Sequence, residues 1–104
     1  MILYHRTTAD GAHAILSGGF RDATGYYLSR VETAGVWLSD RPIDANEGAK
    51  GKVLLRVVLP IDKRELRQYE WIKAGKSYRE WQLPASLVNK HYLALVVIDG
   101  DVAA

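Results

Sequence analysis

The apolar run Lys-Gly-Lys-Val-Leu-Leu-Arg-Val-Val-Leu-Pro, residues 50–60, constrains the fold of this chain more than any other segment. Apolar residues follow one another here with almost no alternation, which predicts a strand that is buried on both faces. A strand of that kind requires neighbouring strands in a sheet. The chain has 104 residues, which is the length of one domain with a single modest hydrophobic core.

Four further segments predict strands. They are residues 1–6, 35–39, 77–84 and 90–99, and we expect the last of them to be central in the sheet. Residues 21–34 are mixed, with a brief strand at most before the stretch Arg-Val-Glu-Thr-Ala-Gly, which indicates a loop.

Short helices are expected between these strands. Thr7 or Thr8 suits the N-cap of a first helix, and Gly18-Gly19 suits its end, after which Phe20 returns to the core. Pro42 suits the first turn of a second short helix, and residues 62–76 predict a helical turn and a loop. The sum is a compact α+β fold, one domain over residues 1–104 with one or two short helices.

Composition and spacing exclude several kinds of site. The chain has no cysteine, so neither a disulfide nor a cysteine-bound zinc is available. Its three histidines, His5, His13 and His91, lack the spacing of a metal-binding pair, and we expect no metal. The glycines match neither a phosphate loop nor a dinucleotide-binding turn.

Charge and hydropathy indicate a location and narrow the partners. The formal net charge of +2 does not by itself indicate nucleic acid, although it would not oppose an anionic ligand. No apolar run approaches the ~20 residues of a membrane helix, and the N-terminus does not resemble a signal peptide. We therefore expect a cytoplasmic protein with no membrane partner.

Three residues stand out because their types are unusual at their positions in the predicted strands. His5 lies on the first strand, Trp37 shares a strand face with Ser39, and Glu80 lies within a later strand, where glutamate is mildly disfavoured. Each also has a structural interpretation: a histidine bonded to backbone, a core aromatic, and a solvated carboxylate. Their order along the chain is more informative than any one of them.

The sequence around these residues resembles the ADP-ribosyltransferase catalytic domain. "LYHRT", followed by a helix and "GF", resembles the family's opening Tyr/Trp-His-Gly-Thr/Ser motif, and "AGVWLSDRP" resembles its glycine-hydrophobic-tyrosine-hydrophobic strand. "GKVLLRVVLP" is similar to the long core strand of the poly-ADP-ribose polymerase branch, and "SYREWQLPASLV" to the segment with the catalytic glutamate. The resemblance covers most of the chain and is strongest to compact bacterial members, the rifampin ADP-ribosyltransferases and toxin domains.

The resemblance implies a split antiparallel sheet and an enzyme that cleaves NAD between nicotinamide and ribose. The ADP-ribose would pass to an acceptor, or to water in an NAD glycohydrolase, and a toxin role with an antitoxin or immunity partner is open. By the resemblance Glu80 and His5 are catalytic: Glu80 stabilises an oxocarbenium-like transition state and His5 hydrogen-bonds a ribose hydroxyl.

The remaining implied contacts bind NAD. Trp37, beside Ser39, would stack on the pyridinium ring, because an indole is the best aromatic face for a cation. Backbone groups of Arg6 would hold the carboxamide, and Arg6, Thr7 and Arg21 are candidates for the pyrophosphate.

The chain departs from the family pattern at three positions. Arg6 replaces the usual glycine after the histidine, and Trp37 replaces the tyrosine. Tyr78, two residues before Glu80, stands where arginine-modifying members have glutamate or glutamine, which disfavours protein arginine as acceptor. Protein, nucleic acid and small molecules all remain open as the acceptor.

Two other functions are possible alternatives. A third alternative is an inactive domain that still binds NAD. An RNA 2′-phosphotransferase-like enzyme would gather arginines, for which Arg6, Arg21, Arg30 and Arg41 are candidates. A non-enzymatic binding module would instead expose aromatic residues, for which Tyr69, Trp71 and Tyr78 are candidates.

Overall fold

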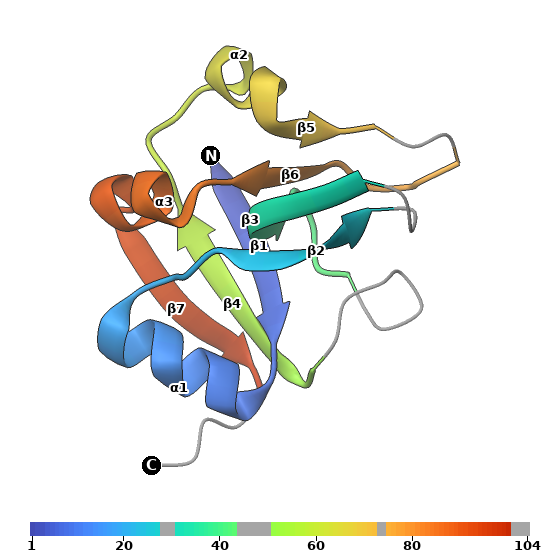
Figure 1. The fold of residues 1–104 in the computed structure, drawn as a ribbon. Helices are drawn as coiled ribbons and strands as arrows, with labels where there is room; N and C mark the ends of the chain where they lie inside the picture. Colours follow the sequence, from blue (N-terminus) through green and yellow to red (C-terminus); the bar gives the residue numbers. More distant parts are fainter. Residues whose placement is uncertain (28–30, 44–50, 73–74, 101–104) are drawn as a thin grey trace.

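The computed structural model describes residues 1–27, 31–43, 51–72 and 75–100 (Figure 1). In chain order the elements are β1 (Ile2–Thr7), α1 (Ala9–Gly18), β2 (Ala23–Tyr27), β3 (Val31–Ser39), β4 (Val53–Val58), α2 (Lys63–Leu66), a 3₁₀ turn (Arg67–Tyr69), β5 (Glu70–Trp71), β6 (Glu80–Leu83), α3 (Ala85–His91) and β7 (Ala94–Asp99).

The chain is an α+β fold built on an antiparallel sheet. Six strands follow the order β5-β6-β3-β1-β4-β7, and β2 pairs with β3 off this path. Every pair of neighbouring strands is antiparallel. The strand with His5 therefore lies next to the strand with Trp37, which lies next to the strand with Glu80.

The sheet opens between β1 and β3. β1 pairs with β4 along its whole length, from Ile2 to Thr7, but its register with β3 consists of one pair, Tyr4 opposite Ser39. Beyond that pair, β1 continues with β4 while β3 continues with β2. The pairing of β1 with β3 therefore ends next to His5.

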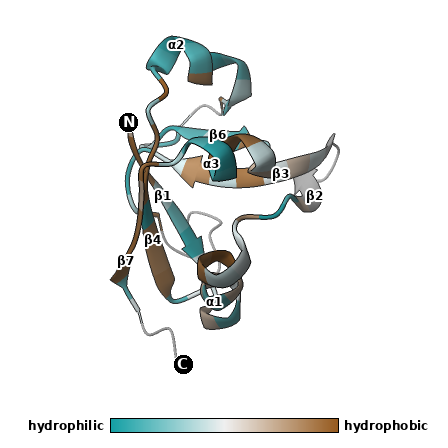
Figure 2. Cartoon of the chain, turned by 90° about the vertical axis from the view of Figure 1, so that its left-hand side faces the viewer, coloured by the Kyte–Doolittle hydropathy of each residue, from teal (hydrophilic) through white to brown (hydrophobic). Residues whose placement is uncertain are grey.

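All three α-helices pack on one face of the sheet. Ala12 of α1 packs with Val53 and Leu55 of β4, while Leu66 of α2 and Val88 of α3 join the larger cluster around Leu3. Residues opposite each other in the register share a face, so this is also the face of His5, which lies opposite Leu55. Figure 2 shows the hydrophobic residues along β4 and β7, in contrast to the largely hydrophilic α2.

The other face of the sheet, called the polar face below, carries buried polar residues on β3 and β6. Thr33, Ser39 and Gln82 are the buried polar residues of the described part of the chain, and their alternation along β3 and β6 places all three on this face. Gln82 donates a hydrogen bond to the Thr33 hydroxyl at 3.1 Å, which satisfies both side chains away from water. Trp37 lies between Thr33 and Ser39 in this row.

Several expected elements are confirmed. Thr8 is the N-cap of α1, with its side chain accepting the Gly11 amide at 3.0 Å, and the helix ends at Gly18. Gly19 follows with φ of 88°, a conformation that favours glycine. Phe20 is buried in the core, and β4 is buried on both faces from Val53 to Leu55.

Other expectations are corrected. β7 is an edge strand, not a central one, and its Val96 and Ile98 are 42% and 41% exposed. It begins at Ala94 because α3 extends to His91, so the chain has three short α-helices instead of one or two. The strand expected from residue 77 begins at Glu80, and the mixed segment carries β2 and the start of β3. Most of the helix expected after Pro42 lies outside the described residues.

Candidate functional site

His5 bridges the opening of the sheet. Its Nδ1 lies 2.7 Å from the carbonyl oxygen of Trp37, in place of the missing backbone pairing between β1 and β3. A carbonyl can only accept, so Nδ1 carries the hydrogen and the neutral ring presents Nε2 as an acceptor. The Phe20 ring packs against the imidazole edge-on, with centroids 5.5 Å apart and planes at 80°.

Burial lowers the pKa of His5 below its ordinary value, and the hydrogen bond to Trp37 offsets part of that effect. The imidazole is therefore neutral at pH 7. As a neutral ring it accepts a hydrogen bond from a ligand through Nε2, whereas donation through Nε2 would require the charged form.

A cavity of about 210 Å³ lies beside His5 at this opening. It is lined by β1, the second half of α1, the α1–β2 connection, β2 and β3. His5, Thr7, Arg21 and Trp37, four of the residues selected from the sequence, are among its lining residues. Among the described residues, the cavity lining does not include Glu80, Arg6 or Ser39.

The backbone of Arg6 is directed into the opening. Met1 forms its backbone hydrogen bonds with Leu59, on the β4 side of the strand. Backbone groups alternate in direction along a strand, so those of Arg6 point to the opposite side, toward β3. The Arg6 guanidinium is directed elsewhere, because its Nε donates to the carbonyl of Ile43.

Glu80 lies on the polar face, two strands away from His5. It is opposite Ser39 on β3 and opposite Trp71 on β5, and Trp37 is its diagonal neighbour because Trp37 faces Gln82. Diagonal neighbours have Cα atoms roughly 7–8 Å apart, within reach of long side chains. The Trp37 and Trp71 ring centroids are 6.0 Å apart at an angle of 50°, so the two indoles pack against each other in the neighbourhood of Glu80.

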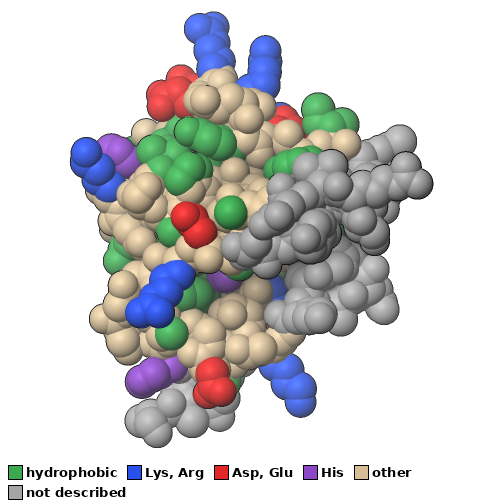
Figure 3. Space-filling model, in the orientation of Figure 1, with side chains coloured by type: hydrophobic (Ala, Val, Ile, Leu, Met, Phe, Trp, Pro, Cys, Tyr) green, Lys and Arg blue, Asp and Glu red, His purple; other side chains and the backbone are tan. Residues whose placement is uncertain are grey.

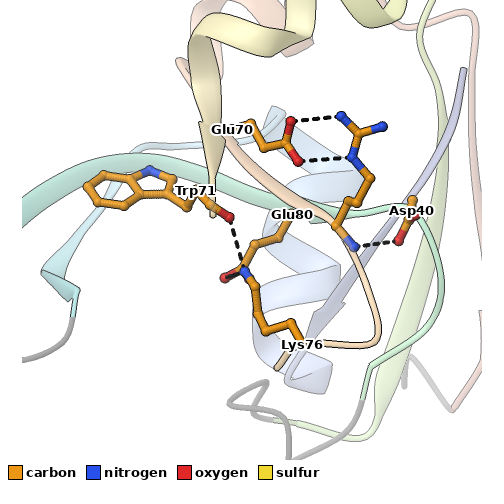
Figure 4. A network of polar contacts seen from close by, with 6 residues as sticks. Asp40, Glu70, Trp71, Lys76 and Glu80 are labelled. Atoms are coloured by element: carbon orange, nitrogen blue, oxygen red, sulfur yellow. Dashed lines mark hydrogen bonds and ion pairs between the residues drawn. The ribbon is translucent and has the colours of Figure 1, made fainter. Parts of the chain in front are cut away.

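Lys76 holds the Glu80 carboxylate (Figure 4). Its Nζ lies 2.7 Å from Oε1 of Glu80 and donates to the carbonyl of Trp71 at 3.1 Å. The two charged side chains are only 11% and 13% exposed. The same ammonium lies 5.1 Å from the centre of the Tyr78 ring. A carboxylate, a carbonyl and one aromatic ring thus already surround this cation.

A second ion pair fixes the start of β6. Arg79 makes two hydrogen bonds to Glu70, at 2.9 and 2.7 Å, and its backbone amide donates to Asp40 at 2.9 Å (Figure 4). The bonds from Arg79 lower the pKa of the Glu70 carboxyl. These contacts join β5, β6 and the end of β3 at the residue before Glu80.

Ser39 has a structural role in this arrangement. It is 3% exposed, and its hydroxyl donates to the carbonyl of Arg41 at 2.7 Å and lies 3.4 Å from that of Tyr4. Its hydroxyl is thus committed to the backbone where β1 and β3 meet, away from the cavity.

The described arginines and aromatic residues on which the two alternative functions depend do not gather at one place. Arg21 is at the cavity and Arg6 is bonded to Ile43, while Arg41 donates to Ser77 and Pro42; Arg30 lies outside the described residues. Tyr69, Trp71 and Tyr78 are each partly buried, and Tyr69 packs against the core. On the face drawn in Figure 3, basic and acidic side chains are interspersed.

Sequence reasoning missed Phe20 as a cavity residue, Lys76 as the partner of Glu80, and the site role of Trp71. Lys76 is four residues before Glu80, but that spacing indicates a contact only in a helix, and this segment is not helical. Trp71 becomes a neighbour of Glu80 only through the pairing of β5 with β6.

Among the described residues no group of three or more His, Cys, Asp or Glu side chains is placed to hold a metal ion. Within the same part of the chain no helix is long and apolar enough to cross a membrane.

Comparisons with known proteins found no matching family model, no matching curated protein and no matching solved structure.

Proposed function

We propose that this chain cleaves NAD at the bond between nicotinamide and ribose, as an ADP-ribosyltransferase or an NAD glycohydrolase. The observation that supports the proposal is the adjacency of β1, β3 and β6, which makes the strands of His5, Trp37 and Glu80 neighbours, with Glu80 outside the described cavity lining and on the opposite face of the sheet from His5. These residues are far apart in the chain, and the sequence resemblance assigns all three to NAD.

The proposal requires residues of both faces to serve one ligand at this opening. His5 and the cavity belong to the helix-covered face, whereas Trp37 and Glu80 project on the polar face. Complete ligand sites measure about 300–1,000 Å³, so a cavity of about 210 Å³ holds one part of a dinucleotide. The ligand would lie through the opening, with nicotinamide toward Trp37 and the pyrophosphate toward Arg21.

Glu80 would supply the electrostatic part of the reaction. When the bond from ribose C1′ to nicotinamide breaks, the electron pair stays on the ring nitrogen and the sugar becomes an oxocarbenium ion. A carboxylate beside C1′ stabilises that developing charge. Lys76 occupies Oε1, which leaves Oε2 as the oxygen assigned to the sugar. The acceptor hydroxyl or water then bonds to C1′ and gives up its proton to solvent or to Glu80.

The other residues would bind and orient the substrate. Trp37, with Trp71 beside it, offers an aromatic face to the cationic ring, worth about 0.5–2 kcal/mol. The Arg6 backbone offers a donor and an acceptor to the carboxamide. His5 would accept a hydrogen bond from a ribose hydroxyl through Nε2. The Arg21 guanidinium would donate to the phosphate oxygens, whose geometry it fits.

The test is incubation of the purified protein with NAD labelled in its adenylate part. The expected result is release of nicotinamide, with the label on free ADP-ribose for a glycohydrolase or on an added acceptor for a transferase. Candidate acceptors are supplied separately as protein, nucleic acid and small molecules. Intact NAD after prolonged incubation with all three, at stoichiometric enzyme, would overturn the proposal.

A further inference from the structure

The segment that follows α1 is fastened to α3 by three hydrogen bonds. The Asn89 side chain accepts the amide of Phe20 at 2.7 Å and donates to the carbonyl of the same residue at 2.8 Å. Two residues on, the Asp22 carboxylate accepts the backbone amide of Ala85 at 2.8 Å. Residues 63 to 69 positions apart in the chain are joined in this way.

The backbone around this fastening is adapted to it. A Cβ on Gly19 would lie 3.0–3.3 Å from the Asn89 amide atoms, so the amide packs directly on the glycine. Gly19 also has φ of 88°, which disfavours any larger residue. At the other end, the N-cap of α3 is Pro84, which provides no side-chain cap, and Asp22 supplies the missing acceptor.

The fastened segment forms one wall of the cavity. Gly19, Phe20 and Arg21 all line it, and the Phe20 ring is the edge-on neighbour of His5. Asn89 itself is not among the lining residues in the described part of the chain. It therefore acts on the cavity through Phe20.

We propose that Asn89 is a positioning residue: by holding both backbone groups of Phe20, it fixes the Phe20 ring against His5 and sets the shape of the cavity. As a statement about substrate, this rests on the proposed function, because it takes the cavity as part of the NAD site. As a statement about His5 and Phe20, it stands on the contacts alone.

Asn89 differs from a residue that merely stabilises α3. It is exposed, and the helix is anchored in the core by its neighbours Ala85 and Val88. Alanine has a higher helix propensity than asparagine, so Asn89→Ala leaves α3 itself at no disadvantage. The variant removes the fastening and little else.

The first experiment follows the histidine ring by NMR as a function of pH in wild type and Asn89→Ala. Without the fastening, water reaches His5 as Phe20 moves away, and we expect its pKa to rise toward the ordinary value of about 6.5. Exposed His13 on α1 is the internal reference, and Lys90→Ala, on the next residue of α3, is the matched control. A His5 titration identical in wild type and Asn89→Ala would overturn the proposal.

Hydrogen exchange provides a second readout that does not depend on the alanine variant. The Phe20 amide is bonded to the Asn89 side chain, so its exchange should accelerate in Asn89→Leu, which keeps the shape but can neither accept from the Phe20 amide nor donate to the Phe20 carbonyl. The Val88 amide, which is bonded to Pro84 within α3, should not change. Equal acceleration at both amides would indicate a general loosening of α3 and contradict the assignment.

NAD binding separates this inference from the proposed function. If wild type binds NAD, Asn89→Ala should weaken the affinity by about tenfold, because small displacements of a site wall are costly, while Lys90→Ala should not. If wild type binds no NAD, the proposed function fails, and the two NMR measurements still decide whether Asn89 positions Phe20.

Discussion

At the scale of single residues, the central feature is the Glu80 carboxylate, which is paired with Lys76 and lies opposite Trp71 in the sheet. Lys76 and Glu80 are both largely buried, so their pairing stabilises the β5–β6 end of the sheet as well as placing the carboxylate. A test of Glu80 must therefore separate the loss of the carboxylate from the loss of the ion pair.

Glu80→Gln and Lys76→Met make that separation. Both variants break the same ion pair, but only the first removes the charge assigned to the sugar. We expect Glu80→Gln to lower the rate of nicotinamide release by about 10²-fold or more, and Lys76→Met to lower it much less. Release rates measured at equal folded fractions check this. Equal losses in the two variants would assign the effect to folding.

Trp37→Ala tests the aromatic face. Loss of stacking should weaken NAD binding by about 1–2 kcal/mol, measured by titration calorimetry with Glu80→Gln as the background so that NAD is not consumed. Trp71→Ala is measured for comparison, because it removes the neighbouring indole, whose ring centroid lies 6.0 Å from that of Trp37. An affinity unchanged by Trp37→Ala would leave Trp37 a structural residue only.

His5 makes stability depend on pH with a definite sign. Its pKa is lower in the folded chain than in the unfolded one, so between the two values the unfolded state binds more protons. The stability that the neutral ring contributes is complete above about pH 6.5 and is lost as the pH falls below it. Urea midpoints from pH 8 to pH 5 should therefore fall more steeply in wild type than in His5→Gln. Parallel curves would contradict this account of His5.

At the scale of elements, what the sequence predicts depends on where each signal lies. α1 carries its own cap, Thr8, and its own stop, Gly19, and it was predicted closely. α3 was missed because its N-terminal amide donates to Asp22, 63 residues away, and no local sequence pattern predicts that bond. β7 was expected to be central because its residues are apolar, although an apolar run does not specify its position in a sheet.

Asp22 should therefore contribute to the stability of α3. Asp22→Ala removes the acceptor of the Ala85 amide and should cost about 1 kcal/mol, the usual effect of losing an N-terminal cap. Thermal unfolding measures it, with Ser86→Ala, an exposed position in the same helix, as the control. A melting temperature unchanged by Asp22→Ala would show that solvent replaces the bond at no cost.

At the scale of the whole molecule, the account depends on the strand order. The sequence identified His5, Trp37 and Glu80 one by one, but their neighbourhood follows from the pairings of β1 with β3 and of β3 with β6. It could not identify the partners that tertiary pairing supplies, such as Lys76 for Glu80, or the place where the sheet opens. It also could not exclude Ser39, whose burial depends on the turn of the chain at Arg41.

The chain's three tryptophans allow the arrangement to be tested in one spectrum. Trp37 and Trp71 lie on the polar face beside Glu80, whereas Trp81 is 1% exposed in the core on the other face. The measurement is a titration of the ¹⁵N-labelled Glu80→Gln variant with NAD, following the three indole N–H signals and the ring signals of His5. We expect the signals of Trp37, Trp71 and His5 to shift together with one dissociation constant while that of Trp81 does not. Signals that stay in place at millimolar NAD, or a shift of Trp81 without Trp37, would contradict this arrangement of the site.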